Sequence, residues 1–401
     1  MATQSPAHAG PAIEGRYALV YVPHGGIPDG RGFSPSIVAC ELAKRAKLLR
    51  PWLVCSQEKD SPGRGEWHGI PLDRLGHRRV YRRLGKWRLA PPGRSVPRQL
   101  FAICQEIAPA VLHVHQIEFD INEFRRRSGL SIPIILHAHV LSQRYSSRRG
   151  AATQYIAVSN FVAKHLADMG YPAERIITIR NGVDTQLFAP PTPSEAARAK
   201  ERLGVDGSTP VLAFVGRKHD VKGYPAFLMV AERLLAQDRP LLILGIGADP
   251  ERPTHESGFV ASRERQKKLV RDPRFRLLPA VPQAALAQLY QGIDVTLLPS
   301  RAETQGMAMI ESLAAGCITI SSRVGGIVET IEHGVTGYLA DDPLDVDFLY
   351  RCTSDVLDRL NDLAPLRAAA RSFALEHLDW AVGAARVDAL YNAVIPWPQS
   401  R

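Results

Sequence analysis

The stretch DVTLLPSRAETQGMAMIESLAAGCITISS, residues 294–322, decides the fold of this chain. It opens with an apolar, β-branched run that predicts a buried strand, continues with a helix that begins near Gly306, and closes with a second β-branched run. A strand, a helix and a strand in close succession form a βαβ unit, whose two strands lie parallel in one sheet. The stretch therefore predicts a parallel sheet with helices packed on it.

The same alternation fills the rest of the chain in two halves. In the first half, the buried strand YALVYV (Tyr17–Val22) precedes a helix with Ser34 as N-cap and Pro35 in its first position. A proline-rich polar stretch, residues 184–210, interrupts the alternation, which restarts with the strand VLAFVG at residues 211–216. We therefore expect an α/β protein with two Rossmann-like, doubly wound domains facing a cleft, and a ligand beyond the carboxyl ends of their strands.

These patterns also predict the domain boundaries. The N-terminal segment is polar and lacks the apolar core of a signal peptide, so we expect a flexible tail. The helix expected at residues 378–395 carries an apolar stripe, so we expect it to pack back on the first domain. The expected division is a tail at 1–16, an N-terminal domain at 17–190, a linker at 191–209, a C-terminal domain at 210–377 and the terminal helix at 378–401.

Composition limits the class of protein. The 401 residues are 45% apolar and 22% charged, as in globular proteins. The five cysteines are dispersed and show no C-x-x-C spacing, which argues against a disulfide framework and against a zinc site. No H-E-x-x-H, D-x-D or clustered Cys/His pattern indicates another metal site. No run approaches the roughly 18 apolar residues of a membrane span, so we expect a cytoplasmic protein. Because the metal-binding patterns are missing, we expect no bound metal, and we also expect no cofactor.

The positive charge is concentrated in one segment. From Arg64 to Arg98 the chain carries ten Lys or Arg and two acidic residues, which is a net +8 of the total +10. Within it, Val80, Leu84 and Trp87 share one helical face among arginines, a pattern suited to an anionic membrane surface. An arginine-rich surface helix with no membrane role is the alternative, and no recognition fold supports nucleic-acid binding.

Two cations follow the first strand of the second half. Arg217 and Lys222 lie in the loop between that strand and the next helix. Cations at the carboxyl end of a parallel strand are well placed to hold a diphosphate, since arginine supplies a forked donor and lysine a point charge. A solvated loop without a ligand is the alternative that the spacing leaves open.

The loop and helix after residue 300 carry a second candidate group. Gly306 stands at the expected helix N-terminus, where free N–H groups of the first turn attract an anion. Glu303 precedes it in the loop, and Glu311 follows about two turns into the helix. Glu311 lies too far along to serve the same phosphate, but it could accept hydrogen bonds from the hydroxyls of a ribose, with Glu303 facing the sugar. The alternative is an exposed helix with ordinary acidic residues.

The first half offers weaker candidates. Gly25 and Gly26 follow its first strand, where backbone amides could approach a phosphate, although a Gly-Gly pair is more often a tight turn. His137 and His139 end another strand and could donate to a sugar hydroxyl or to a developing charge. Histidines at strand ends are more often simply part of the structure, and this alternative is stronger for the pair His113 and His115.

At this point the motifs resemble a known family. The stretch from Ser300 to Leu339 resembles the E-x₇-E signature of the family 4 glycosyltransferases of the GT-B fold, and GRKHDVKG resembles their Arg/Lys loop for the donor phosphates. IAVSNFVAKHL and IRNGVDTQLF resemble the stretches that lead to the family's interdomain linker. The resemblance covers roughly residues 17–395 and is more specific in the second half.

The resemblance implies a hexosyltransferase that moves a sugar from a nucleotide-diphosphate sugar to a glycan or lipid-linked acceptor, with retention and without a metal. The N-terminal domain would bind the acceptor and the C-terminal domain the donor. The basic segment would place the enzyme at the inner face of the plasma membrane, and from this segment we expect a role in cell-surface polysaccharide or lipopolysaccharide synthesis. The resemblance implies that Arg217 and Lys222 neutralise the diphosphate and that Glu311 holds the ribose. It implies that Glu303, with the backbone of Gly306, Met307 and Ala308, contacts the donor sugar and phosphate. His137 would lie near the reacting sugar, and the Gly25–Gly26 loop would close over the phosphates.

The chain departs from the family pattern at one point of its signature. The family often has Gly-Phe where this chain has Thr304-Gln305, which affects the expected choice of donor sugar. A nucleotide-sugar epimerase and a non-catalytic nucleotide-sugar binding protein are the alternatives that share the cleft and the ribose contact. A sugar phosphorylase is less consistent with the chain, which has no pyridoxal-lysine signature.

Overall fold

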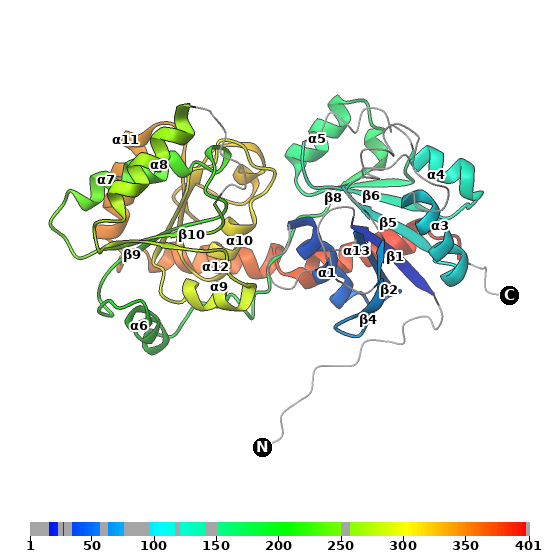
Figure 1. The fold of residues 1–401 in the computed structure, drawn as a ribbon, viewed down its shortest axis with the longest axis horizontal. Coiled ribbons are helices and arrows are strands. Elements are labelled where there is room, and N and C mark those ends of the chain that lie inside the picture. Colours follow the sequence, from blue (N-terminus) through cyan, green and yellow to red (C-terminus); the bar gives the residue numbers. More distant parts are fainter. Residues whose placement is uncertain are drawn as a thin grey trace, which may run out of the picture. The chain divides into compact units, whose positions relative to one another are not determined.

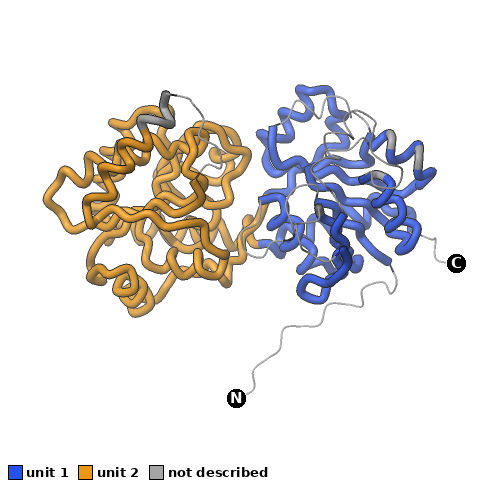
Figure 2. The backbone as a smooth tube through the Cα atoms, viewed as in Figure 1, with its two compact units in different colours: residues 1–180, 380–401 blue, residues 181–379 orange. Residues whose placement is uncertain are grey.

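The computed structural model describes residues 16–22, 27, 34–56, 63–75, 96–116, 121–141, 151–249 and 257–397. The chain forms two compact units, shown in blue and orange in Figure 2. Unit 1 consists of residues 1–180 and 380–401, and unit 2 of residues 181–379. Each unit is built around one sheet with helices packed on it (Figure 1).

The sheet of unit 1 has eight strands in the order β3-β4-β2-β1-β5-β6-β7-β8. All neighbouring pairs are parallel except β3 and β4, which are antiparallel. The central strands are apolar runs buried on both faces, as a parallel sheet covered by helices requires. The strands are β1 (Tyr17–Val22), β2 (Arg50–Ser56), β3 (Arg64–Trp67), β4 (Ile70–Leu75), β5 (Val111–His115), β6 (Ile134–Ala138), β7 (Gln154–Ala157) and β8 (Ile176–Thr178).

The helices of unit 1 include one from the far end of the chain. They are α1 (Ser34–Arg45), α3 (Val96–Ile107), α4 (Ile121–Ser128), α5 (Asn160–Asp168), the short 3₁₀ helix η2 (Ala173–Arg175) and α13 (Trp380–Val394). Ser159 caps α5 by accepting a hydrogen bond from the amide of Val162. Helix α13 packs against α1, and a side chain added at Gly383 would contact Leu42.

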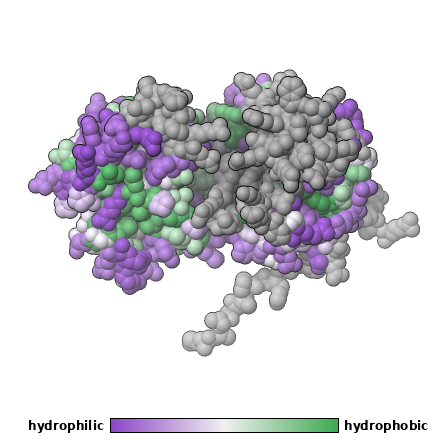
Figure 3. Space-filling view, in the orientation of Figure 1, coloured by the Kyte–Doolittle hydropathy of each residue, from purple (hydrophilic) through white to green (hydrophobic). Residues whose placement is uncertain are grey.

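The sheet of unit 2 is entirely parallel, in the order β11-β10-β9-β12-β13-β14. Its strands are β9 (Val211–Val215), β10 (Leu242–Ile246), β11 (Phe275–Leu278), β12 (Val295–Leu298), β13 (Ile318–Ser322) and β14 (Tyr338–Ala340). Its helices are α6 (Pro193–Arg202), η3 (Asp220–Lys222), α7 (Tyr224–Leu235), α8 (Ser257–Leu269), α9 (Gln283–Tyr290), α10 (Met307–Ala314), η4 (Gly325–Glu329), α11 (Val346–Asp358), α12 (Ala364–His377). On the face drawn in Figure 3, polar residues surround a smaller apolar area of this unit.

The βαβ unit expected at residues 294–322 is confirmed as β12, α10 and β13, whose strands pair in parallel. The motif VGGIVETI, whose glycine pair is typical of a helix N-terminus and predicts a further helix, forms only the five-residue 3₁₀ helix η4. Gly325 has a positive φ of 54°, and Thr330 leaves the 3₁₀ turn with its amide bonded to Ile327, so no α-helix continues.

The segment between the two sheets folds onto unit 2. Thr192 and Glu195 form a capping box at the start of α6. Lys200 of this helix is buried, and its Nζ lies 2.8 Å from the carboxylate of Asp294. The boundaries expected from the sequence were 190/191, 209/210 and 377/378, whereas the compact units divide after Arg180 and after Asp379.

None of the helices in the described part of the chain has the length and apolar content needed to cross a bilayer. Residues 76–95, which hold most of the basic segment, lie outside the described residues. At its start, Arg64 is paired with the carboxylates of Asp73 and Glu106, each at 2.8 Å. Part of the charge counted in the sequence is therefore balanced within the fold.

Candidate active site

The strand order of unit 2 marks where a ligand would bind. Strands β9 and β12 are neighbours, and from this pair the chain winds outward in both directions. Such a reversal leaves a crevice at the carboxyl ends of the two strands, which is where doubly wound sheets bind ligands. The loop of residues 216–223 follows β9, and the loop of residues 299–306 follows β12. The residues singled out in the second half of the sequence therefore come from two loops that leave adjacent strands.

The two loops are fixed to each other through their backbones. The amide of Arg301 donates to the carbonyl of Val221 at 2.9 Å. Gly223 has a φ of 71°, and a Cβ placed on it would lie 1.8 Å from the carbonyl oxygen of Pro299. No side chain fits in that space, so glycine is required for this approach of the loops.

Lys222 and Glu303 form an ion pair between these loops. Both side chains are largely buried, with 27% and 13% of their surfaces exposed. Glu303 also accepts a hydrogen bond from the amide of Thr304 at 3.2 Å. The exposed side chain of Arg217 forms no hydrogen bond or ion pair with the residues that the structure describes. The structure thus brings together the predicted Lys222 and Glu303, and Arg217 offers an unpaired charge in the same loop as Lys222.

Helix α10 begins beside the ion pair. Its N-cap is Gly306, with a φ of 92°, and a Cβ there would lie 3.3 Å from Cγ of Glu303. The amides of Met307 and Ala308 belong to the first turn, which has no intrahelical acceptors. Amides of this kind and a lysine ammonium within one crevice favour the binding of an anion.

Glu311 lies in the second turn of α10 and is 3% exposed. Nε2 of Gln283, at the start of α9, donates to its Oε1 at 3.0 Å. The hydroxyl of Tyr290 donates to the carbonyl of Ala308 at 2.9 Å and joins the two helices. Burial raises the pKa of Glu311 to about 7, and the hydrogen bond from Gln283 only partly opposes this shift.

Two residues of this region were missed by the sequence reasoning. Gln305 is buried, its Oε1 accepts from the amide of Asn181 at 2.7 Å, and its Nε2 donates to the Asn181 carbonyl at 3.1 Å. The departure from the family pattern at Gln305 therefore serves a backbone contact. Lys218 is also buried, with its Nζ 3.6 Å from the carboxylate of Asp249. Its position beside Arg217 was the available signal, but burial of a loop lysine cannot be seen in the sequence.

In unit 1, His137 lies among three other buried imidazoles, which come from β5 and from the end of β6. The ring centroids of His137 are 5.4 Å from His113, 4.8 Å from His115 and 4.3 Å from His139. Burial lowers the pKa of His113 and of His139 to about 3, and lowers those of His115 and His137 well below the usual value. All four are therefore neutral at physiological pH. Gly25 and Gly26 lie outside the described residues.

Comparison with known families gives two adjoining matches. Residues 36–187 match "Glycosyltransferase Family 4", and residues 195–372 match "Glycosyl transferases group 1". The chain belongs to the family 4 glycosyltransferases. The family resemblance seen in the sequence is thereby confirmed, and the chain is a glycosyltransferase. The epimerase and the non-catalytic binding protein are not favoured.

Curated relatives of the chain are also named as glycosyltransferases. The D-inositol 3-phosphate glycosyltransferase of Corynebacterium diphtheriae is 27% identical over 323 residues, which is 73% of this chain and 72% of the relative. The enzyme of that name from Xylanimonas cellulosilytica is 36% identical over 210 residues, 51% of this chain and 49% of the relative. The second match thus spans about half the length of each protein.

Solved structures confirm the fold. Sucrose-phosphate synthase from Thermosynechococcus elongatus has a TM-score of 0.74 and 18% identity, covering 94% of this chain and 98% of that one. HepE of Anabaena, solved with UDP and glucose, has a TM-score of 0.73 and 18% identity, with 94% and 100% covered. The two parallel-sheet units of this family 4 enzyme therefore have the GT-B fold.

Proposed function

We propose that this glycosyltransferase takes its sugar from a nucleotide-diphosphate donor held by unit 2, and transfers it with retention of configuration. The observation that carries the proposal is the Lys222–Glu303 ion pair beside the N-terminus of α10, at the carboxyl ends of β9 and β12. Cations and free amides together suit a diphosphate, and the neighbouring carboxylate suits sugar hydroxyls.

The chemistry of the transfer fits this arrangement. As the bond between the sugar and the diphosphate breaks, negative charge grows on the departing phosphate. Lys222, Arg217 and the amides of Met307 and Ala308 interact with that charge more strongly in the transition state than in the ground state, which lowers the barrier. Neither these contacts nor the proton transfer requires a metal ion, because fixed cations neutralise the leaving group.

Retention follows from a front-face reaction in this proposal. The departing phosphate takes the proton of the acceptor hydroxyl, and the new bond forms on the face that the phosphate leaves. The carboxylate of Glu303 is paired with Lys222, so we assign it to the sugar hydroxyls and not to covalent attack. A glycosyl-enzyme adduct trapped and detected by mass spectrometry would overturn this mechanism.

Glu311 is assigned to the ribose of the donor. Gln283 occupies one of its carboxylate oxygens, so ribose hydroxyls would donate to the other. His137 is assigned to the reacting sugar, as an N–H donor, because its imidazole is neutral and has no hydrogen-bond partner at either nitrogen among the described residues.

Substrate names come from the similar proteins. HepE of Anabaena was solved with UDP-glucose, so UDP-glucose is the first donor to test. The motifs and the basic segment of the sequence favour a glycan or lipid-linked acceptor in cell-surface polysaccharide or lipopolysaccharide synthesis, whereas the names of the relatives favour inositol 3-phosphate. A transfer assay with UDP-glucose and GDP-mannose against both acceptor classes separates these alternatives, because only the correct pair releases nucleotide and product together.

The basic segment from Arg64 to Arg98 is proposed to hold the enzyme at an anionic membrane, where a lipid-linked acceptor would be reached. Each basic residue near such a surface is worth up to about 1 kcal/mol. Sedimentation with vesicles containing phosphatidylglycerol at low salt tests the proposal. The absence of binding under these conditions would end it.

The decisive variant for the donor site is Lys222→Ala. Removing one preorganised donor that stabilises a leaving group costs on the order of 10²–10³ in rate. We therefore expect turnover at saturating donor to fall by that factor, while Lys164→Ala, which removes an exposed lysine paired with Asp168, leaves turnover unchanged. Unchanged turnover in Lys222→Ala would remove the phosphate role of this lysine.

A further inference from the structure

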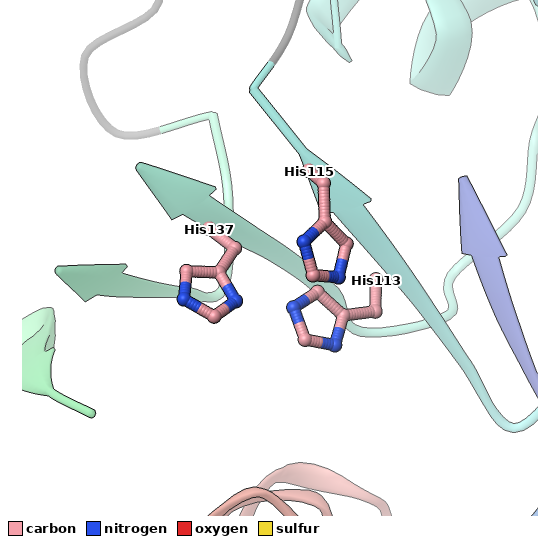
Figure 4. Close-up of side chains that lie close together, drawn as sticks. All are labelled: His113, His115 and His137. Atoms are coloured by element: carbon pink, nitrogen blue, oxygen red, sulfur yellow. The ribbon is translucent and has the colours of Figure 1, made fainter. Parts of the chain in front are cut away.

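Four histidines of unit 1 project from one face of two neighbouring strands. His113 and His115 alternate along β5, so their side chains share a face, and the register of the sheet places His115 opposite His137 of β6. His139 follows just after β6 and stacks on His137. Figure 4 shows the rings of His113, His115 and His137 gathered at this face.

The ring nitrogens of this cluster are only partly used. Nδ1 of His113 lies 2.7 Å from the hydroxyl of Tyr391 on α13, and Nδ1 of His115 lies 3.0 Å from Nε2 of His139. Among the described residues, no protein group bonds to Nε2 of His113, to Nε2 of His115 or to either nitrogen of His137. Buried polar atoms are rarely left in this state, because each one costs about 1–3 kcal/mol. The unused nitrogens therefore call for an explanation.

We propose that His113, His115 and His137 bind a divalent transition-metal ion, with Zn²⁺ as the first candidate. One nitrogen from each of the three rings lies within 4.8 Å of the others. Three imidazoles around tetrahedral zinc, with Zn–N bonds of about 2.1 Å, place their nitrogens about 3.4 Å apart. The rings must therefore move inward by about 1 Å, which small rotations of the side chains provide.

The hydrogen bonds behind the rings match those of metal-binding histidines. Such a histidine commonly donates its second N–H to a fixed partner, which sets its tautomer. With Nε2 on the metal, Nδ1–H of His113 would donate to Tyr391 and Nδ1–H of His115 to His139. The lone pair of each Nε2 is then directed to the ion, and both hydrogen bonds already present are kept.

The surroundings also suit an ion. A small cavity of about 20 Å³ is lined by His113 and His115 together with Asp388 and Tyr391. It has room for one water molecule, which would complete a fourth position. The nearby Asp388 carboxyl would offset part of the metal charge.

The ion has a structural role in this proposal. It would join β5 to β6 and, through Tyr391, to the C-terminal helix α13, while the donor contacts of unit 2 remain unchanged. Only one nitrogen of His137 is needed, so its other nitrogen keeps a proton and the role assigned to it in the transfer is not lost. The metal site does not depend on the proposed function.

The test is the metal content of the full-length protein. After expression with added Zn²⁺ and gel filtration, we expect elemental analysis to find about one zinc per chain. His115→Gln should lose that equivalent, whereas His377→Gln, which changes an exposed histidine of α12, should keep it. No stoichiometric zinc in the unaltered protein, or equal zinc in both variants, would overturn the proposal and leave the cluster as a hydrated group of histidines.

A second measurement does not depend on the variant's fold. Cobalt added to metal-free protein should give the visible absorption of a four-coordinate Co²⁺ ion, and Zn²⁺ should displace it. Tyr391→Phe keeps the shape of its side chain but removes the partner of His113, so zinc affinity should fall roughly 10- to 100-fold. An octahedral cobalt spectrum, or unchanged affinity in Tyr391→Phe, would contradict the site as described.

Discussion

At the scale of single residues, burial changes what the acidic groups of the signature can do. Glu303 and Glu311 are equivalent in the sequence, where both appear as glutamates flanking a glycine and a short apolar run. In the structure Glu303 is paired with a lysine, whereas Glu311 is enclosed and accepts a hydrogen bond from the side-chain amide of Gln283. The two carboxyl groups therefore have different surroundings in the folded chain.

Glu311→Gln should reverse part of the pH dependence of stability. The pKa of Glu311 is raised to about 7 in the folded chain, so the folded chain holds its proton more tightly than the unfolded chain does. This stabilisation is present at low pH and is lost as the pH rises toward 7. Between pH 5 and pH 8, the free energy of unfolding of the variant should rise by up to about 3 kcal/mol relative to that of the unaltered chain.

Urea unfolding at pH 5 and pH 8 measures that difference, with the exposed Glu332→Gln as the control that should show none. An equal difference for the two variants would mean that Glu311 is not enclosed as the structure has it.

Gln305→Ala should destabilise unit 2. The substitution leaves the amide and the carbonyl of Asn181 without their partners, and each buried group without a partner costs about 1–3 kcal/mol. We expect a loss of about 3 kcal/mol in the free energy of unfolding. Gln186→Ala, at an exposed position of the same unit, should change it by no more than about 0.5 kcal/mol. Similar losses in both variants would show that the Asn181 contact is not what Gln305 contributes.

At the scale of elements, the proposed donor site depends on two loops that approach each other more closely than side chains allow. Strands β9 and β12 bring the loops to one edge of the sheet, but their final contact is between backbones, at Gly223 and Pro299. The position of Lys222 next to this contact means that its charge is placed by the packing of the loops.

Gly223→Ala and Gly334→Ala distinguish the cost of a positive φ from the cost of a steric overlap. Both glycines have a positive φ, 71° and 79°, which costs an alanine about 1–2 kcal/mol. At Gly334 nothing lies within 4 Å of an added Cβ, whereas at Gly223 the Cβ would overlap the Pro299 carbonyl. We expect Gly223→Ala to lose about 3 kcal/mol or more and to weaken nucleotide binding, and Gly334→Ala to lose only the conformational cost.

Thermal unfolding and titration with UDP provide the two readouts for this pair. If both variants lost the same stability and bound UDP equally well, the close contact between the loops would not be needed for the site.

At the scale of the whole molecule, the end of the chain belongs to the unit in which the chain begins. Helix α13 packs on α1, its Tyr391 bonds to His113, and the carboxylate of Asp388 accepts from the amide of Lys47 at 2.9 Å. Unit 2 has its own hydrophobic core, which runs from Val183 to Leu378 and includes no residue of α13. The two units therefore differ in their dependence on the last residues.

Deleting residues 380–401 should loosen unit 1 selectively. We expect faster amide hydrogen exchange in β1, β5 and α1, because these elements lose a covering helix, and unchanged exchange in β9 and β12. Hydrogen exchange followed by mass spectrometry resolves these segments. Equal loosening of both units, or of neither, would contradict the division that the structure shows.

The sequence by itself determined the fold class and the family. Apolar runs with β-branched residues have to be buried, and their alternation with capped helices leaves a parallel, doubly wound sheet as the arrangement that buries them. The E-x₇-E stretch and the Arg/Lys loop carried the resemblance to the family 4 glycosyltransferases, and the positions of Lys222, Glu303 and Gly306 within their loops followed from the same patterns.

Only the tertiary structure decided which of these residues meet and in what state. The Lys222–Glu303 pair joins residues from two loops, the partner of Gln305 is a backbone far away in the sequence, and the four histidines come together only through the register of β5 and β6. The spacing of these histidines along the chain matches no known metal-binding motif. Burial and long-range pairing are properties of the packed sheet, since strands distant in sequence become neighbours only when the sheet forms.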